Sequence, residues 1–237
     1  MPSQCCADLT DDTPRPVHSP VPAVTQYATP DLIGGIAYKG YDPACDDGWR
    51  TTGAPTRAAY ARWCRHMCGI ACLRMALLHR DGHAPSMFQL LTGARHYGAY
   101  VQQTGGDIKG LIYAPFGQYV RATHALPADV HPDLTMPALL NLLDAGRMVM
   151  ASVSKEIRRP DLEPERRGGH LVLVIGRGDK VVYFRNPSGH TPQAREGSLP
   201  ADRFEAFFGG RGLSLDLPAT VRRRPAAYRP ATQAARE

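Results

Sequence analysis

The strongest helical pattern in the chain is CGIACLRMALLHR, residues 68–80. Its apolar residues recur at helical spacings, which is typical of a buried helix, and the following Asp81–Gly82 is a typical helix end. The segment begins with a cysteine and a glycine, Cys68–Gly69. A thiol at a helix N-terminus lies at the positive end of the helix dipole, so we expect a lowered pKa and a nucleophilic thiolate at Cys68.

Further helical patterns follow at residues 87–91, 107–125 and 137–145. Ser86 and Gln89 fit a capping box at the start of the first of these helices. Pro115 is expected to kink or split the second, and Thr135 to cap the third.

Beyond residue 146 the apolar pattern changes to short runs rich in Val, Ile and Leu. These runs cover residues 147–154, 170–176 and 180–185. They predict strands, and the short Arg177–Gly178–Asp179 link predicts that the last two form a hairpin. A final helix is expected over residues 201–208. A helical first half and an antiparallel second half indicate an α+β fold.

The chain of 237 residues is long enough for one large domain. We expect the folded body over residues 31–218. Residues 1–30 hold six prolines and little apolar periodicity, which predicts a loose arm able to dock on the body. Residues 219–237 have the composition of a basic C-terminal tail.

Charge and hydropathy exclude several classes of protein. The 28 basic and 22 acidic residues leave a net charge of +6, but the basic residues are scattered apart from Arg222–Arg224, so no nucleic-acid-binding face is expected. No run approaches the ~20 apolar residues of a membrane-spanning helix. The first thirty residues lack the apolar core of a secretory signal. These features predict a cytoplasmic protein with mostly reduced cysteines.

Three cysteines, Cys64, Cys68 and Cys72, are spaced four residues apart. On a helix they would share one face, so a metal cluster is one interpretation. Zinc and iron–sulfur sites use shorter spacings such as C-x2-C, and we therefore expect no metal and no cofactor. Cys72 is better interpreted as a small buried apolar residue.

A cysteine nucleophile needs a base, and the predicted hairpin supplies a candidate. His170 begins one strand and Asn186 follows the next. If the strands pair, the two residues become neighbours, and the Asn186 oxygen can hold one ring nitrogen while the other faces a thiol. Cysteine, histidine and asparagine in this chain order are typical of cysteine proteases. The alternative is that His170 and Asn186 are merely polar residues at strand ends.

Three motifs in order resemble the C39-like peptidases of the papain-like superfamily. They are CGIACLRM at 68–75, GGHLVLVIG at 168–176 and NPSG at 186–189, and the resemblance covers about residues 60–210. It implies a papain-like fold with Cys68 as nucleophile, His170 as general base and then acid, and Asn186 as the residue that orients the imidazole.

The sequence departs from that family before the nucleophile. The family usually has a glutamine about six residues before the cysteine, where it completes the oxyanion hole, and this position is Arg62. Hydrolysis needs donors at the developing oxyanion. The backbone N–H of Cys68 is one candidate donor, and the side chains of Arg62, Trp63, Arg65 and His66 are others. His190 could also line the site, although it could equally be an ordinary loop histidine.

These observations predict an acyl-transfer enzyme that acts through an acyl-thioester on Cys68. A cysteine peptidase or amide hydrolase is the first hypothesis, with a peptide, an amide or an acyl-thioester as substrate. An amide-forming acyltransferase of natural-product biosynthesis could use the same triad, with an amine in place of water. A third hypothesis is a pseudo-peptidase that binds without catalysis.

Overall fold

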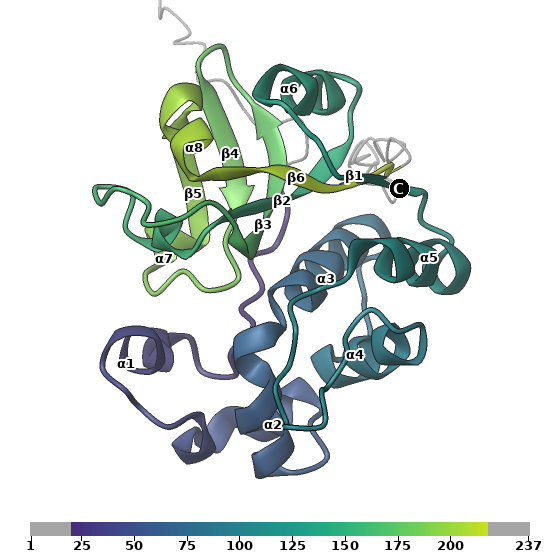
Figure 1. The fold of residues 1–237 in the computed structure, drawn as a ribbon, viewed down its shortest axis with the longest axis vertical. Helices are drawn as coiled ribbons and strands as arrows, with labels where there is room; N and C mark the ends of the chain where they lie inside the picture. The colour runs from purple at the N-terminus through teal and green to yellow at the C-terminus, as the bar shows by residue number, and fades with distance from the viewer. Residues whose placement is uncertain (1–19, 218–237) are drawn as a thin grey trace, which may run out of the picture.

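An antiparallel sheet occupies the second half of the chain, in the computed structural model that describes residues 20–217 (Figure 1). Among these residues its strand order is β1-β6-β2-β3-β4-β5. The strands are β1 (Ala128–His131), β2 (Met148–Ser154), β3 (Gly169–Arg177), β4 (Val181–Arg185), β5 (Glu196–Pro200) and β6 (Phe208–Leu215). The predicted hairpin of β3 and β4 is confirmed.

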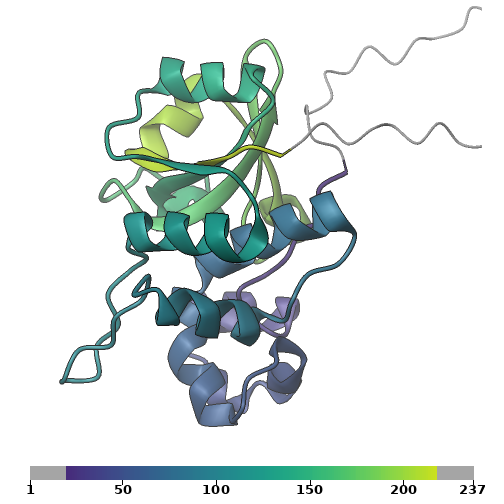
Figure 2. The same ribbon diagram turned by 90° about the vertical axis from the view of Figure 1, so that its right-hand side faces the viewer.

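Helices precede the sheet and cover its two faces. The α-helices are α1 (Ile33–Tyr38), α2 (Arg57–Trp63), α3 (Cys68–Asp81), α4 (Met87–His96), α5 (Tyr113–His124), α6 (Met136–Asp144), α7 (Pro192–Arg195) and α8 (Ala201–Phe207). Short 3-10 helices are η1 (Pro30–Leu32), η2 (Pro43–Cys45), η3 (Asp47–Thr52), η4 (Cys64–His66) and η5 (Lys155–Arg158). Figures 1 and 2 show α1–α5 gathered on one side, with α6 and α8 against the sheet. The α+β class is therefore confirmed.

The central strands are buried along almost their whole length because both faces of the sheet are covered. Alternate residues of a strand point to opposite faces. Met148 and Met150 of β2 pack in the core shared with the helices α2–α5, whereas Val149 and Val153 pack in a second core with α6 and α8. The first four residues of β2 therefore form a continuous apolar run rather than an alternating one.

Local capping signals place most of the helices as expected. The 68–80 pattern forms α3, Ser86 and Gln89 form the capping box of α4, and the Thr135 side chain caps α6. The expectation for residues 107–125 was wrong in part, since α5 begins only at Tyr113. Pro115 therefore lies in the first turn, where its missing N–H costs no helical hydrogen bond, and no kink is needed.

Residues 20–29, the N-terminal segment, lie against both halves of the fold. The Gln26 backbone N–H donates to Pro187 O at 2.8 Å, and its side-chain Nε2 donates to Cys64 O at 2.8 Å. Arg185 Nε donates to Val21 O at 2.9 Å. One short segment thus joins the turn after β4 to the turn before α3.

A buried carboxylate anchors the end of this segment. The Tyr60 hydroxyl donates to Asp46 Oδ2 at 2.7 Å and accepts the Ala28 N–H at 3.0 Å, while Thr29 Oγ1 donates to Asp46 Oδ1 at 2.6 Å. Tyr60 and Asp46 have no exposed surface, so the charge depends on these bonds and on the Gly48 N–H. The arm predicted for residues 1–30 falls partly here; residues 1–19, Pro218 and the tail predicted at 219–237 lie outside the described residues.

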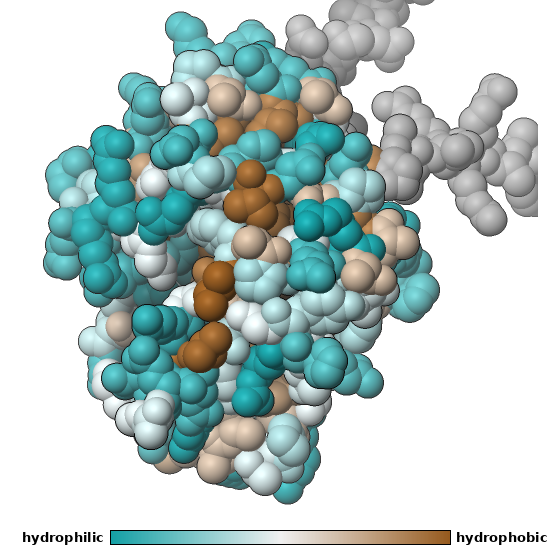
Figure 3. All heavy atoms as spheres, turned by 45° about the vertical axis from the view of Figure 1, so that its right-hand side comes forward, coloured by the Kyte–Doolittle hydropathy of each residue, from teal (hydrophilic) through white to brown (hydrophobic). Residues whose placement is uncertain are grey.

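The surface is mostly hydrophilic on the face shown in Figure 3, with small separate apolar groups. Exposed large apolar side chains on the described surface are Tyr38, Val101, Ile112 and Leu162. Within residues 20–217, the helices are too short or too polar for any of them to span a bilayer.

Candidate active site

His170 and Asn186 are brought together by the β3–β4 hairpin. His170 is the second residue of β3, and Asn186 directly follows β4. Because the strands are antiparallel, the start of one lies beside the end of the other. Nε2 of His170 lies 2.9 Å from Oδ1 of Asn186, and both side chains are buried.

The hydrogen bonds of Asn186 identify the tautomer of His170. The backbone N–H of Ser188 donates to Asn186 Oδ1 at 3.0 Å. An N–H can only donate, so the atom it meets is the amide oxygen. His170 Nε2 must then carry the proton that is shared with this oxygen. The other ring nitrogen, Nδ1, keeps its lone pair and can accept a proton.

Ser188 and Arg158 surround this pair. The Ser188 hydroxyl lies 2.9 Å from His170 Nε2 and 3.2 Å from Asn186 Oδ1, and it accepts a 2.7 Å hydrogen bond from Arg158 Nε. Arg158 ends η5, directly after β2. Nε2 of His170 therefore lies within hydrogen-bond distance of two oxygens, those of Asn186 and Ser188. Arg158 is bonded to the second of these oxygens.

Cys68 and His170 line the same cavity, which has a volume of about 190 Å³. Cys68 is the first residue of α3, and α3 packs against β3. The first N–H groups of a helix have no partner within the helix. In α3 the Ala71 N–H donates to Met67 O at 2.9 Å, one turn earlier. The cavity thus brings together a thiol at the start of a helix and an imidazole.

Burial, rather than the helix dipole, has the largest effect on the pKa of the Cys68 thiol. The expected lowering of its pKa was wrong: burial raises the pKa of Cys68, although backbone hydrogen bonds from Leu171 and Gly69 and the charge of Arg158 act in the opposite direction. Desolvation penalises the thiolate more than these donors stabilise it. The protonated thiol is therefore favoured at Cys68.

His170 is likewise neutral in the resting site. Burial, together with the nearby charge of Arg158, lowers the pKa of His170 to about 3, against the opposing effect of its hydrogen bond to Asn186. A neutral imidazole with a free Nδ1 lone pair is a base ready to accept a proton. The site therefore starts as a neutral pair of thiol and imidazole.

The other sequence candidates are distributed over different places. Arg65 and His66 line the Cys68 cavity, and burial with the Arg65 charge lowers the pKa of His66. Arg62 is exposed and is absent from the cavity lining. Trp63 is buried, with its ring edge-to-face against Tyr100.

His190 lines a separate and larger cavity of about 660 Å³, together with Arg158 and Arg159. No residue is common to the linings of the two cavities. The structure therefore brings Cys68, His170, Asn186, Arg65 and His66 together and places His190 in the other cavity.

Several residues of the site were missed by the sequence reasoning. Tyr113, Ser152 and Arg211 line the Cys68 cavity, and none belongs to a local motif. Ser188 did carry a signal: in Asn-Pro-Ser, the asparagine oxygen commonly accepts the N–H two residues later, and this turn forms here. Arg158 comes from η5, which follows β2 and is positioned by the folded sheet.

The cysteines of α3 and its approach do not form a metal site. Cys64 and Cys72 are buried, and their thiols point to the carbonyls of Ala61 and Leu171 at 3.6 Å and 3.8 Å. Among the described residues, no group of three His, Cys, Asp or Glu side chains could hold a metal ion.

Comparisons with known proteins give similar solved structures only. No family model matches the chain, and no curated protein matches it. A structure described as that of a C39-like peptidase from Bacillus anthracis is 16% identical, with a TM-score of 0.44 over 64% of this chain and 88% of that chain. The peptidase domain of Streptococcus ComA, a bifunctional ABC transporter of a quorum-sensing pathway, is 13% identical, with a TM-score of 0.43 over 63% and 90%. The family named for the first structure is the one that the three sequence motifs resemble.

Proposed function

We propose that this protein is a cysteine-dependent acyl-transfer enzyme, a peptidase or amide hydrolase that acts through an acyl-thioester on Cys68. The observation that carries the proposal is the 2.9 Å contact between His170 Nε2 and the Asn186 oxygen, beside a cavity lined by both Cys68 and His170. A thiol, a base and a group that orients the base are the parts that nucleophilic catalysis requires.

The neutral resting pair suggests the order of proton transfers. As the Cys68 sulfur forms its bond to the substrate carbonyl carbon, His170 Nδ1 takes the thiol proton. The imidazolium then gives this proton to the leaving amine, and the carbon–nitrogen bond breaks to leave the acyl-thioester. In the second half His170 removes a proton from water, whose oxygen bonds to the thioester carbon. The carbon–sulfur bond then breaks, the acid is released, and the imidazolium returns the proton to the Cys68 sulfur.

The oxyanion is best stabilised by the start of α3. The N–H groups of Cys68 and Gly69 have no helical partner and lie at the positive end of the helix dipole. Arg62 occupies the position of the glutamine in the resembled family but is exposed. Tyr113, which lines the cavity with Cys68, is a neutral side-chain donor within it.

The charges of the cavity favour an anionic acyl donor. Arg65 and Arg211 both line it, and neither forms an ion pair with a carboxylate among residues 20–217. Guanidinium groups without a carboxylate partner are suited to carboxylate or phosphate groups of a substrate.

Amide-forming acyl transfer is the second candidate, supported by Arg62 in place of a glutamine. An acyl-thioester substrate distinguishes it from hydrolysis. With an amine present, a hydrolase releases free acid, whereas a transferase forms the amide at the expense of the acid. A non-catalytic binding module produces neither.

The first test is alkylation by iodoacetamide at mildly acidic pH, read by peptide mass spectrometry. Thiols without a base react slowly there, and the resting Cys68 thiol, whose pKa is raised by burial, reacts readily only if His170 takes its proton during the attack. We expect Cys68 to react first in the wild type and to lose this preference in His170→Ala. The exposed His83 provides the matched control, and His83→Ala should behave as wild type. Equal reaction of all cysteines, or an inert Cys68, would overturn the proposal.

A further inference from the structure

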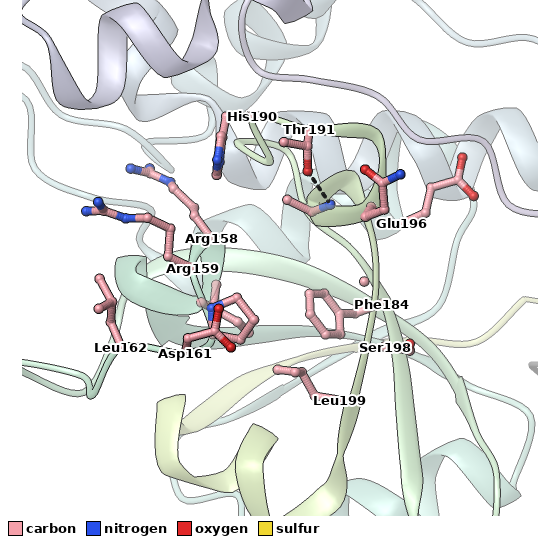
Figure 4. Close-up of a pocket in the computed structure, with 15 residues that line it drawn as sticks. Arg158, Arg159, Asp161, Leu162, Phe184, His190, Thr191, Glu196, Ser198 and Leu199 are labelled. Carbon is pink, nitrogen blue, oxygen red and sulfur yellow. Dashed lines mark hydrogen bonds between the residues drawn. The ribbon is translucent and has the colours of Figure 1, made fainter.

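The larger cavity lies between η5 and the segment from His190 to Leu199 (Figure 4). Its volume of about 660 Å³ lies within the range of small-molecule sites. The wall combines apolar side chains, among them Phe184, Leu199 and Leu162, with a few polar groups, as is usual for such sites.

The positive groups of the cavity are concentrated at one end. Figure 4 shows the guanidinium groups of Arg158 and Arg159 on the same side as His190, with Asp161 and Glu196 apart from them. Burial lowers the pKa of His190, and the charges of Arg159 and Arg158 lower it further. Nδ1 of His190 is buried and has no hydrogen-bond partner in the described structure.

The two carboxylates of the lining do not neutralise this end. Glu196 lies 3.7 Å from Arg185, and Asp161 is exposed. Among the described residues, neither Arg158 nor Arg159 has a carboxylate within ion-pair distance. Arg159 instead lies over the Tyr38 ring, 4.1 Å from its centroid. The cavity therefore has an apolar body and an unpaired cationic end.

We propose that this cavity binds an amphipathic carboxylate, with the carboxylate at Arg158 and Arg159 and the apolar body against Phe184 and Leu199. A planar guanidinium matches a carboxylate through two parallel hydrogen bonds. The Nε of Arg158 is already committed to Ser188, which fixes the side chain and leaves its terminal nitrogens for a ligand. The same chemistry is carried by a free acyl or aryl acid and by the C-terminal end of a peptide with an apolar last residue.

The site is connected to the catalytic pair by one residue. Arg158 donates to Ser188, and the Ser188 hydroxyl lies 2.9 Å from His170 Nε2. A carboxylate bound at Arg158 offsets the positive charge that disfavours a protonated His170. If His170 takes the proton of Cys68, as the proposed function requires, an acid bound at Arg158 makes this proton transfer easier. The bound acid is then an activator of Cys68.

The test measures binding of octanoate by titration calorimetry, with octanamide as the neutral analogue. We expect saturable binding of octanoate, and at least about tenfold weaker binding of octanamide and of octanoate to Arg159→Met. Arg57→Met removes an exposed arginine elsewhere and should bind octanoate as wild type does. A peptide ending in phenylalanine, with a free or an amidated C-terminus, distinguishes a peptide end from a free acid as the natural source.

Three results overturn the site, and two of them are the absence of saturable binding to wild type and equal affinities for octanoate and octanamide. Equal weakening in Arg159→Met and Arg57→Met does so as well. The coupling is read separately from the Cys68 alkylation rate with and without saturating octanoate, which we expect to rise at least about threefold. An unchanged rate at a reactive Cys68 overturns the coupling, whereas an inert Cys68 overturns the proposed function, and calorimetry decides the site in either case.

Discussion

Removal of the Asn186 side chain tests the arrangement of the site most directly. In Asn186→Ala the backbone N–H of Ser188 loses its acceptor, and His170 loses one of its two oxygen neighbours while the Ser188 hydroxyl remains. The Ser188 N–H is then fully unpaired, which costs about 1–3 kcal/mol; the Ser188 hydroxyl also loses this acceptor but is free to rotate. Since each kcal/mol lowers Tm by about 2–4 °C in a domain of this size, Tm should fall by roughly 2–12 °C.

The same substitution should also slow the chemistry. General acid–base catalysis contributes about 10²–10⁴ to a rate, and His170 keeps one of its two contacts. We therefore expect the alkylation rate of Cys68 at mildly acidic pH to fall at least about tenfold. Thermal unfolding followed by circular dichroism gives the first quantity, and peptide mass spectrometry of timed samples gives the second.

Asn141 provides the matched control because it is an exposed asparagine on α6. Asn141→Ala should change stability by no more than about 0.5 kcal/mol and leave Cys68 unaffected. If Asn186→Ala is as stable as Asn141→Ala and Cys68 reacts at the wild-type rate in both, then the Asn186 oxygen neither satisfies the Ser188 turn nor orients the imidazole, and the reasoning is refuted.

Three further predictions concern burial. The free energy of unfolding should fall as pH decreases from 6.5 towards the folded pKa of His170, about 3, because only the unfolded chain takes up the proton. The slope is up to about 1.4 kcal/mol per pH unit, and His170→Gln should flatten it in urea titrations. Gly197→Ala should cost about 1–3 kcal/mol, measured as Tm, since an added methyl would lie 2.4 Å from the Phe184 ring. Tyr60→Phe should cost at least about 1–3 kcal/mol in urea unfolding, because Asp46 loses a buried donor.

Exposed residues of the same type serve as controls for these three changes. His83→Gln should keep the pH slope of the wild type, because this histidine is exposed. Gly105→Ala places its methyl in open space, and Tyr38→Phe changes a partly exposed hydroxyl. An effect of a control that equals the effect of its buried counterpart contradicts the corresponding prediction.

The parts of the site that sequence reasoning found are those fixed by short-range geometry. The period of residues 68–80 defines α3 and with it the place of Cys68. A short link between two strands leaves one way of pairing, and this brings Asn186 beside His170. Each inference needs only neighbours along the chain and the spacing of a helix or a hairpin.

The parts that were missed depend on contacts between distant segments. β6 contains Phe-Gly-Gly-Arg-Gly, which has little strand character, yet it pairs with both β1 and β2. Gly212 is needed there because a side chain would lie 2.6 Å from Met150 O. Arg158 reaches Ser188 across 30 residues, and no local pattern encodes such a contact.

The Cys68 thiol marks a different limit. Its position at the start of α3 was predicted correctly, but the predicted thiolate was wrong. The helix dipole is a property of the helix alone, whereas desolvation depends on what covers the sulfur, and here burial dominates. The position of Cys68 could be predicted from the helical pattern, whereas the direction of its pKa shift depends on the whole fold.

The contacts of the N-terminal segment have a consequence for the order of events during synthesis. Residues 20–29 leave the ribosome before the rest of the body, yet Val21 and Gln26 find their partners at Arg185 and Pro187. Their docking must wait until more than 150 further residues have been translated. The segment that joins the Cys64 turn to the turn after Asn186 is therefore made early but cannot dock until most of the domain has been translated, so a nascent chain cannot use it to hold the start of α3 beside His170 and Asn186 before then.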